Sequence, residues 1–213
     1  IGNDLSERNL PDRAEKMWKR SLKIRPHWRI YGNLGQLELN RGDADAAEYY
    51  ALKALSLNST NSVLYMTLGM AYLAQKRFQL AETNLRRACS ITPREAGFHH
   101  NLALCLYKQG RLAEAEVEAR TALTLGPGVA RFLAGLGGIL RDQGKYAESE
   151  SVLLSGIKNN PENPELIANF AVLQMKTGHL DRAREILSNY MTAYPQNQND
   201  PRIKSALQAV NRP

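Results

Sequence analysis

The sequence predicts an all-α protein: a right-handed α-solenoid of helix-turn-helix repeats that ends in a C-terminal capping helix. The first observation is that residues 65–93 read as two amphipathic helices, joined by a tight turn and stopped by a proline. The second is that the same pattern of large and small residues returns at a spacing of about 34 residues. A helical hairpin cannot bury its apolar face alone, so a period of this length indicates stacked hairpins.

Several positions keep this spacing along the chain, and small residues recur where two helices must approach closely. Large apolar residues of the first helices are Leu34, Leu68, Leu102, Leu136 and Phe170. The small residues after them are Gly35, Gly69, Ala103, Gly137 and Ala171. The second helices carry Ala14, Ala47, Ala81, Ala115, Ser149 and Ala183. The turns contain Asn9, Gly42, Lys76, Gly110, Gly144 and Gly178. The repeats end at Pro26, Ser59, Pro93, Pro127, Pro161 and Pro195.

These columns resemble those of the tetratricopeptide repeat (TPR) superfamily over nearly the whole chain. The sequence departs from the usual pattern at Ser59, where a proline is usual, and at Lys76 in a turn. It also departs at Gly156 and Tyr190, where a third alanine is usual. The resemblance implies a superhelix whose first helices line an inner, concave wall and whose second helices lie outside.

The predicted repeats follow one another without a linker. Residues 1–27 are a truncated repeat, and the full repeats are 28–61, 62–95, 96–129, 130–163 and 164–197. Residues 198–213 form a capping helix and tail, which Asp200 and Pro201 start. The apolar stripe of that helix is Ile203, Ala206, Leu207 and Val210. Because Ile1 falls within the pattern of a first helix, we expect one continuous domain that is a fragment of a longer chain.

The second helix of the truncated repeat, residues 11–25, carries a basic stripe. Helical spacing places Lys16, Lys19, Arg20 and Lys23 on one face. The opposite face is expected to pack inward and consists of Ala14, Met17, Trp18, Ser21 and Leu22. The stripe is either a solvated outer face or a docking surface for an acidic partner or for membrane lipids. Nucleic acid is the least favoured partner, because no aromatic residues alternate with the charges.

Composition leaves the compartment open. A net charge of +7 is compatible with an acidic protein, nucleic acid or an anionic lipid surface as a partner, without requiring one. No apolar run is long enough to span a membrane, and peripheral membrane contact stays open. Cys89 and Cys105 have mostly apolar neighbours and are expected to be buried free thiols, which slightly favours the cytoplasm. A missing N-terminus would keep a periplasmic or lumenal location open.

No motif predicts catalysis, a cofactor or a metal site. His99 and His100 are adjacent, so on a helix they point about 100° apart and cannot bind one metal together. No cysteine pair has the spacing of a zinc site. Gly135, Gly137 and Gly138 lie inside a helical pattern, whereas a phosphate-binding loop needs its glycines between a strand and a helix. The chain is therefore predicted not to be an enzyme.

The first helices carry a row of amide side chains on the wall that the resemblance makes concave. This asparagine ladder reads Asn33, Thr67, Asn101, Gly135 and Asn169. An asparagine side chain offers two donors and an acceptor, so it can pair with both the N–H and the C=O of an extended peptide. Peptide-binding superhelices use a similar device. The alternative is that asparagine is simply tolerated on a wet surface.

Neighbouring columns complete the predicted groove. They supply Arg29, Gln36, Asn40, Met66, Met70, His100, Lys108, Arg131, Asp142 and Lys176. Met66 and Met70 share a face, where they either accept an apolar anchor or pack half-buried. Arg131, with Asn101 and Lys108, is a candidate for binding a carboxylate. The clamp with which TPR domains of chaperone partners hold a C-terminal carboxylate is not expected, because Met66 and Met70 occupy two of its positions.

The predicted function is a non-catalytic protein-interaction module without a cofactor. Its groove would bind an extended, flexible segment of a protein partner on a preformed surface. One alternative is a homo-oligomeric or multiprotein assembly scaffold that uses the convex face and the ends, as in pilus, secretion or envelope systems. Another is an accessory domain of a larger enzyme, such as a glycosyltransferase.

Overall fold

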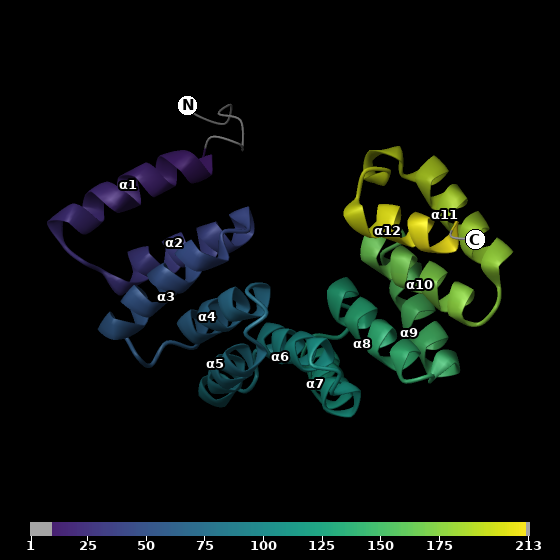
Figure 1. Ribbon diagram of the computed structural model, residues 1–213, viewed down its shortest axis with the longest axis horizontal. Helices are drawn as coiled ribbons and strands as arrows, with labels where there is room; N and C mark the ends of the chain where they lie inside the picture. Colours follow the sequence, from purple (N-terminus) through teal and green to yellow (C-terminus); the bar gives the residue numbers. More distant parts are fainter. Residues whose placement is uncertain (1–9, 212–213) are drawn as a thin grey trace. The chain divides into compact units, whose positions relative to one another are not determined.

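The computed structural model describes residues 10–211, with side chains from residue 13 onward. Within that range the chain forms twelve α-helices and one short 3-10 helix, with no strand (Figure 1). The all-α helical-repeat prediction is confirmed. The expected remnant of a first helix in residues 1–9, including the turn at Asn9, lies outside the described residues.

The helices follow one another with short connections, which within a hairpin have two residues between α2 and α3 and three in the other hairpins. Their bounds are α1 Leu10–Ile24, α2 Trp28–Arg41, α3 Ala44–Leu57, α4 Ser62–Ala74, α5 Phe78–Ile91, α6 Ala96–Lys108, α7 Leu112–Leu125, α8 Ala130–Asp142, α9 Tyr146–Asn159, α10 Pro164–Lys176, α11 Leu180–Ala193, η1 Pro195–Asn197 and α12 Pro201–Val210. Even-numbered helices up to α10 are the first helices of the predicted repeats, and odd-numbered helices are the second.

The chain forms two compact units, residues 1–105 and 106–213. In the first unit α2 packs against α1, α3 and α4, and α4 packs against α3 and α5. In the second unit α8 packs against α7, α9 and α10, and α10 also packs against α9, α11 and α12. In both units a first helix thus packs against its own second helix and against a neighbouring first helix, as α2 does with α3 and α4. The right-handed twist of the whole stack stays a prediction.

The turn inside each hairpin contains one residue in the left-handed region. Four turns use glycine there, and Lys76 adopts the same conformation with φ 61°. The amide of the next residue then bonds back to the end of the first helix, as Asp43 N does to Glu38 O at 2.9 Å and Arg77 N to Tyr72 O at 2.8 Å. Lys76 therefore accepts a backbone conformation that costs a side-chain-bearing residue roughly 1–2 kcal/mol.

The two helices of a hairpin meet at the columns of small residues. Ala47, Ala81, Ala115, Ser149 and Ala183 have no exposed surface. A methyl group at Gly69 would lie 2.7 Å from Leu85 Cγ and 3.2 Å from the carbonyl oxygen of Ala81. In the fourth full repeat the Ser149 hydroxyl donates to the carbonyl of Gly137 at 2.7 Å. Only small residues permit this separation between the helices.

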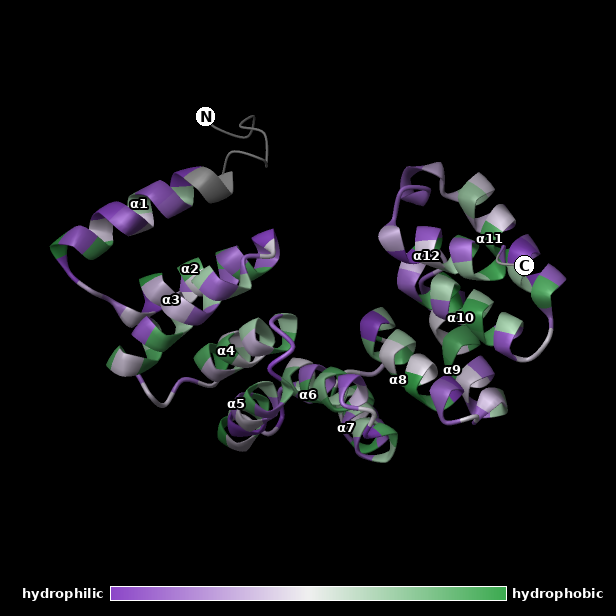
Figure 2. Cartoon of the chain, viewed as in Figure 1, coloured by the Kyte–Doolittle hydropathy of each residue, from purple (hydrophilic) through white to green (hydrophobic). Residues whose placement is uncertain are grey.

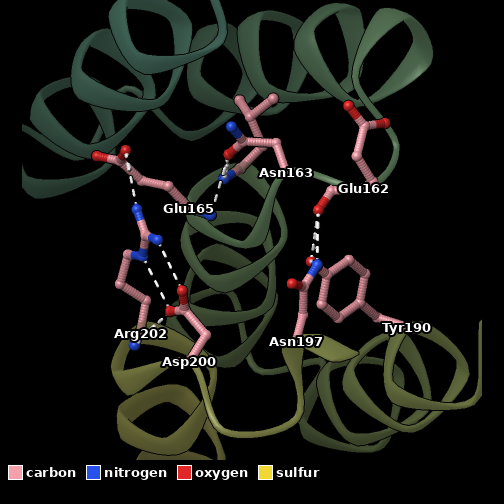
Figure 3. A network of polar contacts seen from close by, with 8 residues as sticks. Glu162, Asn163, Glu165, Tyr190, Asn197, Asp200 and Arg202 are labelled. Carbon is pink, nitrogen blue, oxygen red and sulfur yellow. Dashed lines mark hydrogen bonds and ion pairs between the residues drawn. The ribbon is translucent and has the colours of Figure 1, made fainter. Parts of the chain in front are cut away.

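The two departures from the third alanine column have structural reasons. At Gly156 a Cβ would lie 2.7 Å from Leu166 Cδ2, so the missing side chain makes room for a leucine of α10. Tyr190 lies where the repeats end and the chain turns into η1 and α12. Its hydroxyl donates to the carbonyl of Glu162 at 2.6 Å and accepts from Asn197 Nδ2 at 2.7 Å (Figure 3).

Helix α12 closes the second unit as expected for a capping helix. Asp200 caps it by accepting from Arg202 N at 2.8 Å, and Pro201 occupies its first turn. The predicted apolar stripe is buried at Ile203, Ala206 and Val210, and Leu207 is half-buried. This stripe packs against apolar residues of α10 and α11.

The structure of α1 differs from the prediction for its inward face. Ala14, Trp18 and Leu22 are half-buried, but Met17 is 71% exposed and Ser21 is exposed, so the prediction that all five pack inward was wrong. The reason is that, among the described residues, α1 packs against α2, and a single neighbour covers only a narrow stripe of a helix. In Figure 2 most of α1 carries the colour of hydrophilic residues.

A column of glutamates, which the sequence reading missed, joins successive repeats. It directly follows the small residue of the second helices and consists of Glu15, Glu48, Glu82, Glu116 and Glu150. Glu48 on α3 accepts from Gln75 at 2.8 Å and from Arg77 at 3.0 Å, at the end of α4. Glu15 likewise accepts from Arg41 on α2 at 2.6 Å. These contacts help to fix the register between neighbouring hairpins.

Two adjacent glycines of α8 provide a matched test of the close approach. A Cβ at Gly137 would lie 2.5 Å from Leu153 Cδ2 and 2.6 Å from its Cγ, whereas one at Gly138 would meet its nearest atom at 3.5 Å. We expect Gly138→Ala to raise the free energy of unfolding by up to about 1 kcal/mol through helix propensity. Gly137→Ala should lower it by about 1 kcal/mol or more, because overpacking a core costs about 1–3 kcal/mol. Equal urea midpoints for the two variants would contradict this packing.

Candidate binding surface on the first helices

Two asparagines of the predicted ladder present free amides in the first unit. Asn33 on α2 is exposed, and Asn101 on α6 is half-buried. Neither side chain hydrogen-bonds to another residue within 10–211. Both amides are therefore available to an external partner.

The other members of the column have internal roles. Thr67 on α4 is 1% exposed, and its hydroxyl donates to the carbonyl of Val63 at 2.9 Å. Asn169 on α10 donates through Nδ2 to the carbonyl of Ala134 at 3.2 Å and accepts at Oδ1 from Arg141 at 3.0 Å. The Asn169 amide thereby ties α10 to α8 and keeps one N–H for another acceptor.

The remaining predicted groove residues of the first unit lie on the same helices. Met66 and Met70 are half-buried on α4, and His100 is half-buried on α6. Gln36 is half-buried and donates to Asn40 Oδ1 at 3.2 Å. Arg29 is exposed, with its guanidinium 5.2 Å from the centre of the Trp28 ring.

Two predicted cations and the basic stripe are accessible to solvent. Lys108 at the end of α6 and Arg131 at the start of α8 are exposed. Their grouping with Asn101 involves both units and stays a prediction. The stripe residues Lys16, Lys19, Arg20 and Lys23 are all exposed on α1. Lys19 forms an ion pair of 2.5 Å with Glu15, so part of the stripe's charge is compensated within α1.

The second unit contains a pocket of about 460 Å³ between α8, α10 and α12. It is lined by Arg141, Glu165, Ala168, Asn169, Val172, Pro201, Arg202, Ser205 and Ala206. Asn169 was the one member of this set proposed from the sequence as a site residue. Glu165 stands in the same repeat column as Arg29 and Arg131, so that column could have revealed it. The residues of α12 had no such signal, because α12 lies outside the repeat pattern.

At one end of this pocket a network holds Arg141 in place. Its guanidinium bonds to both carboxylate oxygens of Asp142, at 2.8 and 3.1 Å, and Tyr107 donates to the same carboxylate at 2.5 Å. Burial alone would raise the pKa of Asp142, but the hydrogen bonds from Arg141 and Tyr107 hold that pKa below its usual value. Burial, together with the bond to Asp142, raises the pKa of the Tyr107 hydroxyl.

At the other end Arg202 lies between two carboxylates, as Figure 3 shows. It bonds to Asp200 through Nε at 2.9 Å and Nη2 at 2.7 Å, and its Nη1 is 3.6 Å from Glu165 Oε2. The hydrogen bonds from Arg202 lower the pKa of Asp200. Burial raises the pKa of Glu165, and the nearby charge of Asp200 adds to that effect, against Arg202 and Arg131.

Features of two other classes of site are absent from the described residues. Among residues 10–211 no three His, Cys, Asp or Glu side chains converge in a way that could hold a metal ion. No helix in that range is both long and apolar enough to cross a membrane. Cys89 and Cys105 are buried, as expected.

Two family models, both described as tetratricopeptide repeat, match the chain, one over residues 1–62 and 66–130 and the other over residues 140–210. No curated protein matches it. Among solved structures it is similar to YrrB, "a TPR protein with an unusual peptide-binding site", with a TM-score of 0.62 and 19% identity, covering 90% of this chain and 96% of that one.

Two further structures show the same fold. TTC0263, a thermophilic TPR protein in Thermus thermophilus, has a TM-score of 0.73 and 23% identity, with 85% of this chain and 99% of that one covered. PilW, a widely conserved type IV pilus biogenesis factor, has a TM-score of 0.72 and 22% identity, with coverages of 78% and 76%. At these identities the similarity concerns the fold alone.

The lowered pKa of Asp142 predicts a pH-dependent contribution to stability. A carboxyl group whose pKa is depressed on folding stabilises the protein above its unfolded pKa, and this contribution is lost as the pH falls through the folded pKa. We expect Asp142→Asn to lower the free energy of unfolding at pH 7 by about 1–2 kcal/mol, since hydrogen bonds to charged groups contribute about that much. The difference should shrink below about pH 4, where the unfolded carboxyl group begins to titrate.

Urea denaturation between pH 7 and pH 2.5 measures this difference. Glu185→Gln is the control, because the Glu185 side chain on α11 is exposed and forms no hydrogen bond or ion pair within residues 10–211. That variant should unfold like the original protein at every pH. A deficit of Asp142→Asn that stays constant down to the lowest pH would contradict the role given to this carboxylate.

Proposed function

Because the chain belongs to the tetratricopeptide repeat family, whose repeats generally mediate protein–protein interactions, we propose that it binds an extended segment of a protein partner along the faces of its first helices. The observation that carries this proposal is the pair of accessible amides at Asn33 and Asn101. TPR proteins are generally non-catalytic, and the proposed role requires no reaction.

The chemistry of these amides suits a peptide backbone. Each can donate to a backbone carbonyl and accept from a backbone N–H, and an extended segment presents both groups free of internal hydrogen bonds. The half-buried Met66 and Met70 on α4 can adapt to an apolar side chain of the segment. Since the helices are fixed by their packing, most of the ordering cost falls on the partner. YrrB offers a parallel, because its own description names a peptide-binding site.

Selection from a display library of random, flexible 12-residue peptides tests this proposal. We expect the chain to select binders, and the double variant Asn33→Ala, Asn101→Ala to weaken their binding about tenfold, since each lost hydrogen bond contributes about 0.5–1.5 kcal/mol. Thermal stability should not change, because neither amide has an internal partner. Asn189→Ala is the control, since Asn189 is exposed on the second helix α11.

Two outcomes would contradict the proposal. One is that no peptide binds. The other is that selected peptides bind the double variant as tightly as the original protein, which would locate binding on another surface.

A second candidate function, assembly with further copies of the chain, is favoured by α1. Met17 and Ile24 are 71% and 89% exposed there, one on either side of the basic Arg20 in the sequence. Exposed apolar side chains on one helix face commonly mark protein interfaces. PilW, a pilus biogenesis factor, shows that the fold also occurs in an assembly system.

Sedimentation velocity tests this second candidate. We expect the chain to self-associate at concentrations of tens of micromolar, as weak interfaces do, and Met17→Ser, Ile24→Ser to abolish that association. Because both side chains are exposed, the variant should unfold at the same temperature as the original protein. Monomeric behaviour of the unmodified chain at all concentrations would rule out self-assembly through α1.

A further inference from the structure

We propose that the pocket between α8, α10 and α12 binds the side chain of a lysine or arginine of the partner segment, with Glu165 as its counter-ion. This rests on the proposed function, because the pocket includes Asn169 of the asparagine ladder and lies on the first helices. It adds a preference for a basic side chain to the proposed contacts with the peptide backbone and with an apolar side chain.

Near α12 the carboxylate of Glu165 lacks a closely bonded cation. Arg202 is bonded through two nitrogens to Asp200, and its third nitrogen reaches Glu165 only at 3.6 Å. Glu165 accepts no side-chain hydrogen bond from another residue within 10–211. One guanidinium is therefore shared between two carboxylates, and Asp200 takes the well-formed contact (Figure 3). A second cation at Glu165 would complete the pairing.

The neighbouring arginines do not fill this role. Arg141 also lines the pocket, but Asp142 neutralises it through two hydrogen bonds, and its side chain is only 10% exposed. Arg131 on α8 is exposed and close enough to influence the titration of Glu165, yet it makes no ion pair with it. Glu165 itself is 33% exposed, so an incoming group can reach its carboxylate.

The rest of the pocket suits a long side chain with a charged end. Ala168, Val172, Pro201 and Ala206 offer apolar surface for the methylene groups of lysine or arginine. Ser205 Oγ offers a further acceptor for N–H groups beside Glu165. An acidic side chain would be repelled by Glu165, and a purely apolar one would desolvate that carboxylate without pairing it. The raised pKa of Glu165 agrees with a carboxylate that lacks full compensation.

The same display selection tests the preference for a basic side chain directly. We expect one group of the selected 12-residue peptides to share a lysine or arginine at one position, and Glu165→Gln to weaken the binding of that group about tenfold. Replacing the shared lysine with norleucine, which keeps the aliphatic stem, should weaken binding to the original chain by a similar factor. It should cause no further loss with Glu165→Gln, because the two changes remove one interaction.

Glu162→Gln is the matched control. Glu162 is exposed just before α10 and is not among the pocket residues, so this variant should bind the peptides unchanged. Circular dichroism on heating verifies that Glu165→Gln stays folded. Removing a partly buried charge should leave its melting temperature unchanged or raise it.

The outcomes separate this inference from the proposed function. If none of the selected peptides binds Glu165→Gln more weakly than the original chain, the inference is overturned, and the proposed function still stands where peptides depend on Asn33 and Asn101. A chain that selects no peptide overturns both.

Discussion

The structure depends on the close approach of two helices at the small residues of each hairpin. Ala47 and Ala81 have no exposed surface, and Gly69 and Gly137 have no room for a methyl group beside the leucine they face. Small residues in the helix contacts allow large apolar neighbours such as Leu68 to be buried. Because every hairpin is built in the same way, the outward side chains of successive first helices fall into rows.

Polar contacts then decide which residues of those rows stay available to a partner. On the second helices, Glu48 and Glu116 form hydrogen bonds with the following hairpin, where Gln75 and Lys145 donate to them. Asn169 shares a column with Asn33, yet its amide is occupied because Arg141 is present on the preceding first helix. The same residue type at the same repeat position therefore has a structural role in one unit and free hydrogen-bonding groups in the other.

The fold could be predicted from the sequence because it depends on local, periodic information. Spacing placed Leu34 and Phe170 in equivalent sites, and both are buried. The candidate site was harder to predict from the sequence, because the pocket at Glu165 includes residues of α12, which follows no repeat pattern. The exposure of Met17 could not be predicted from the amphipathic pattern of α1 alone, because it depends on how many helices pack against α1. Amide availability likewise depends on contacts between residues far apart in the sequence.

The central claim is that the faces of the first helices bind an extended polypeptide, and paramagnetic NMR tests it most directly. A spin label on a selected peptide broadens methyl signals that lie near the bound segment. We expect broadening at Met66 and Met70 on the first helix α4, with Leu52 on α3 and Leu80 on α5, second helices of the same unit, unaffected. Broadening at Leu52 and Leu80, with sharp signals from Met66 and Met70, would contradict it.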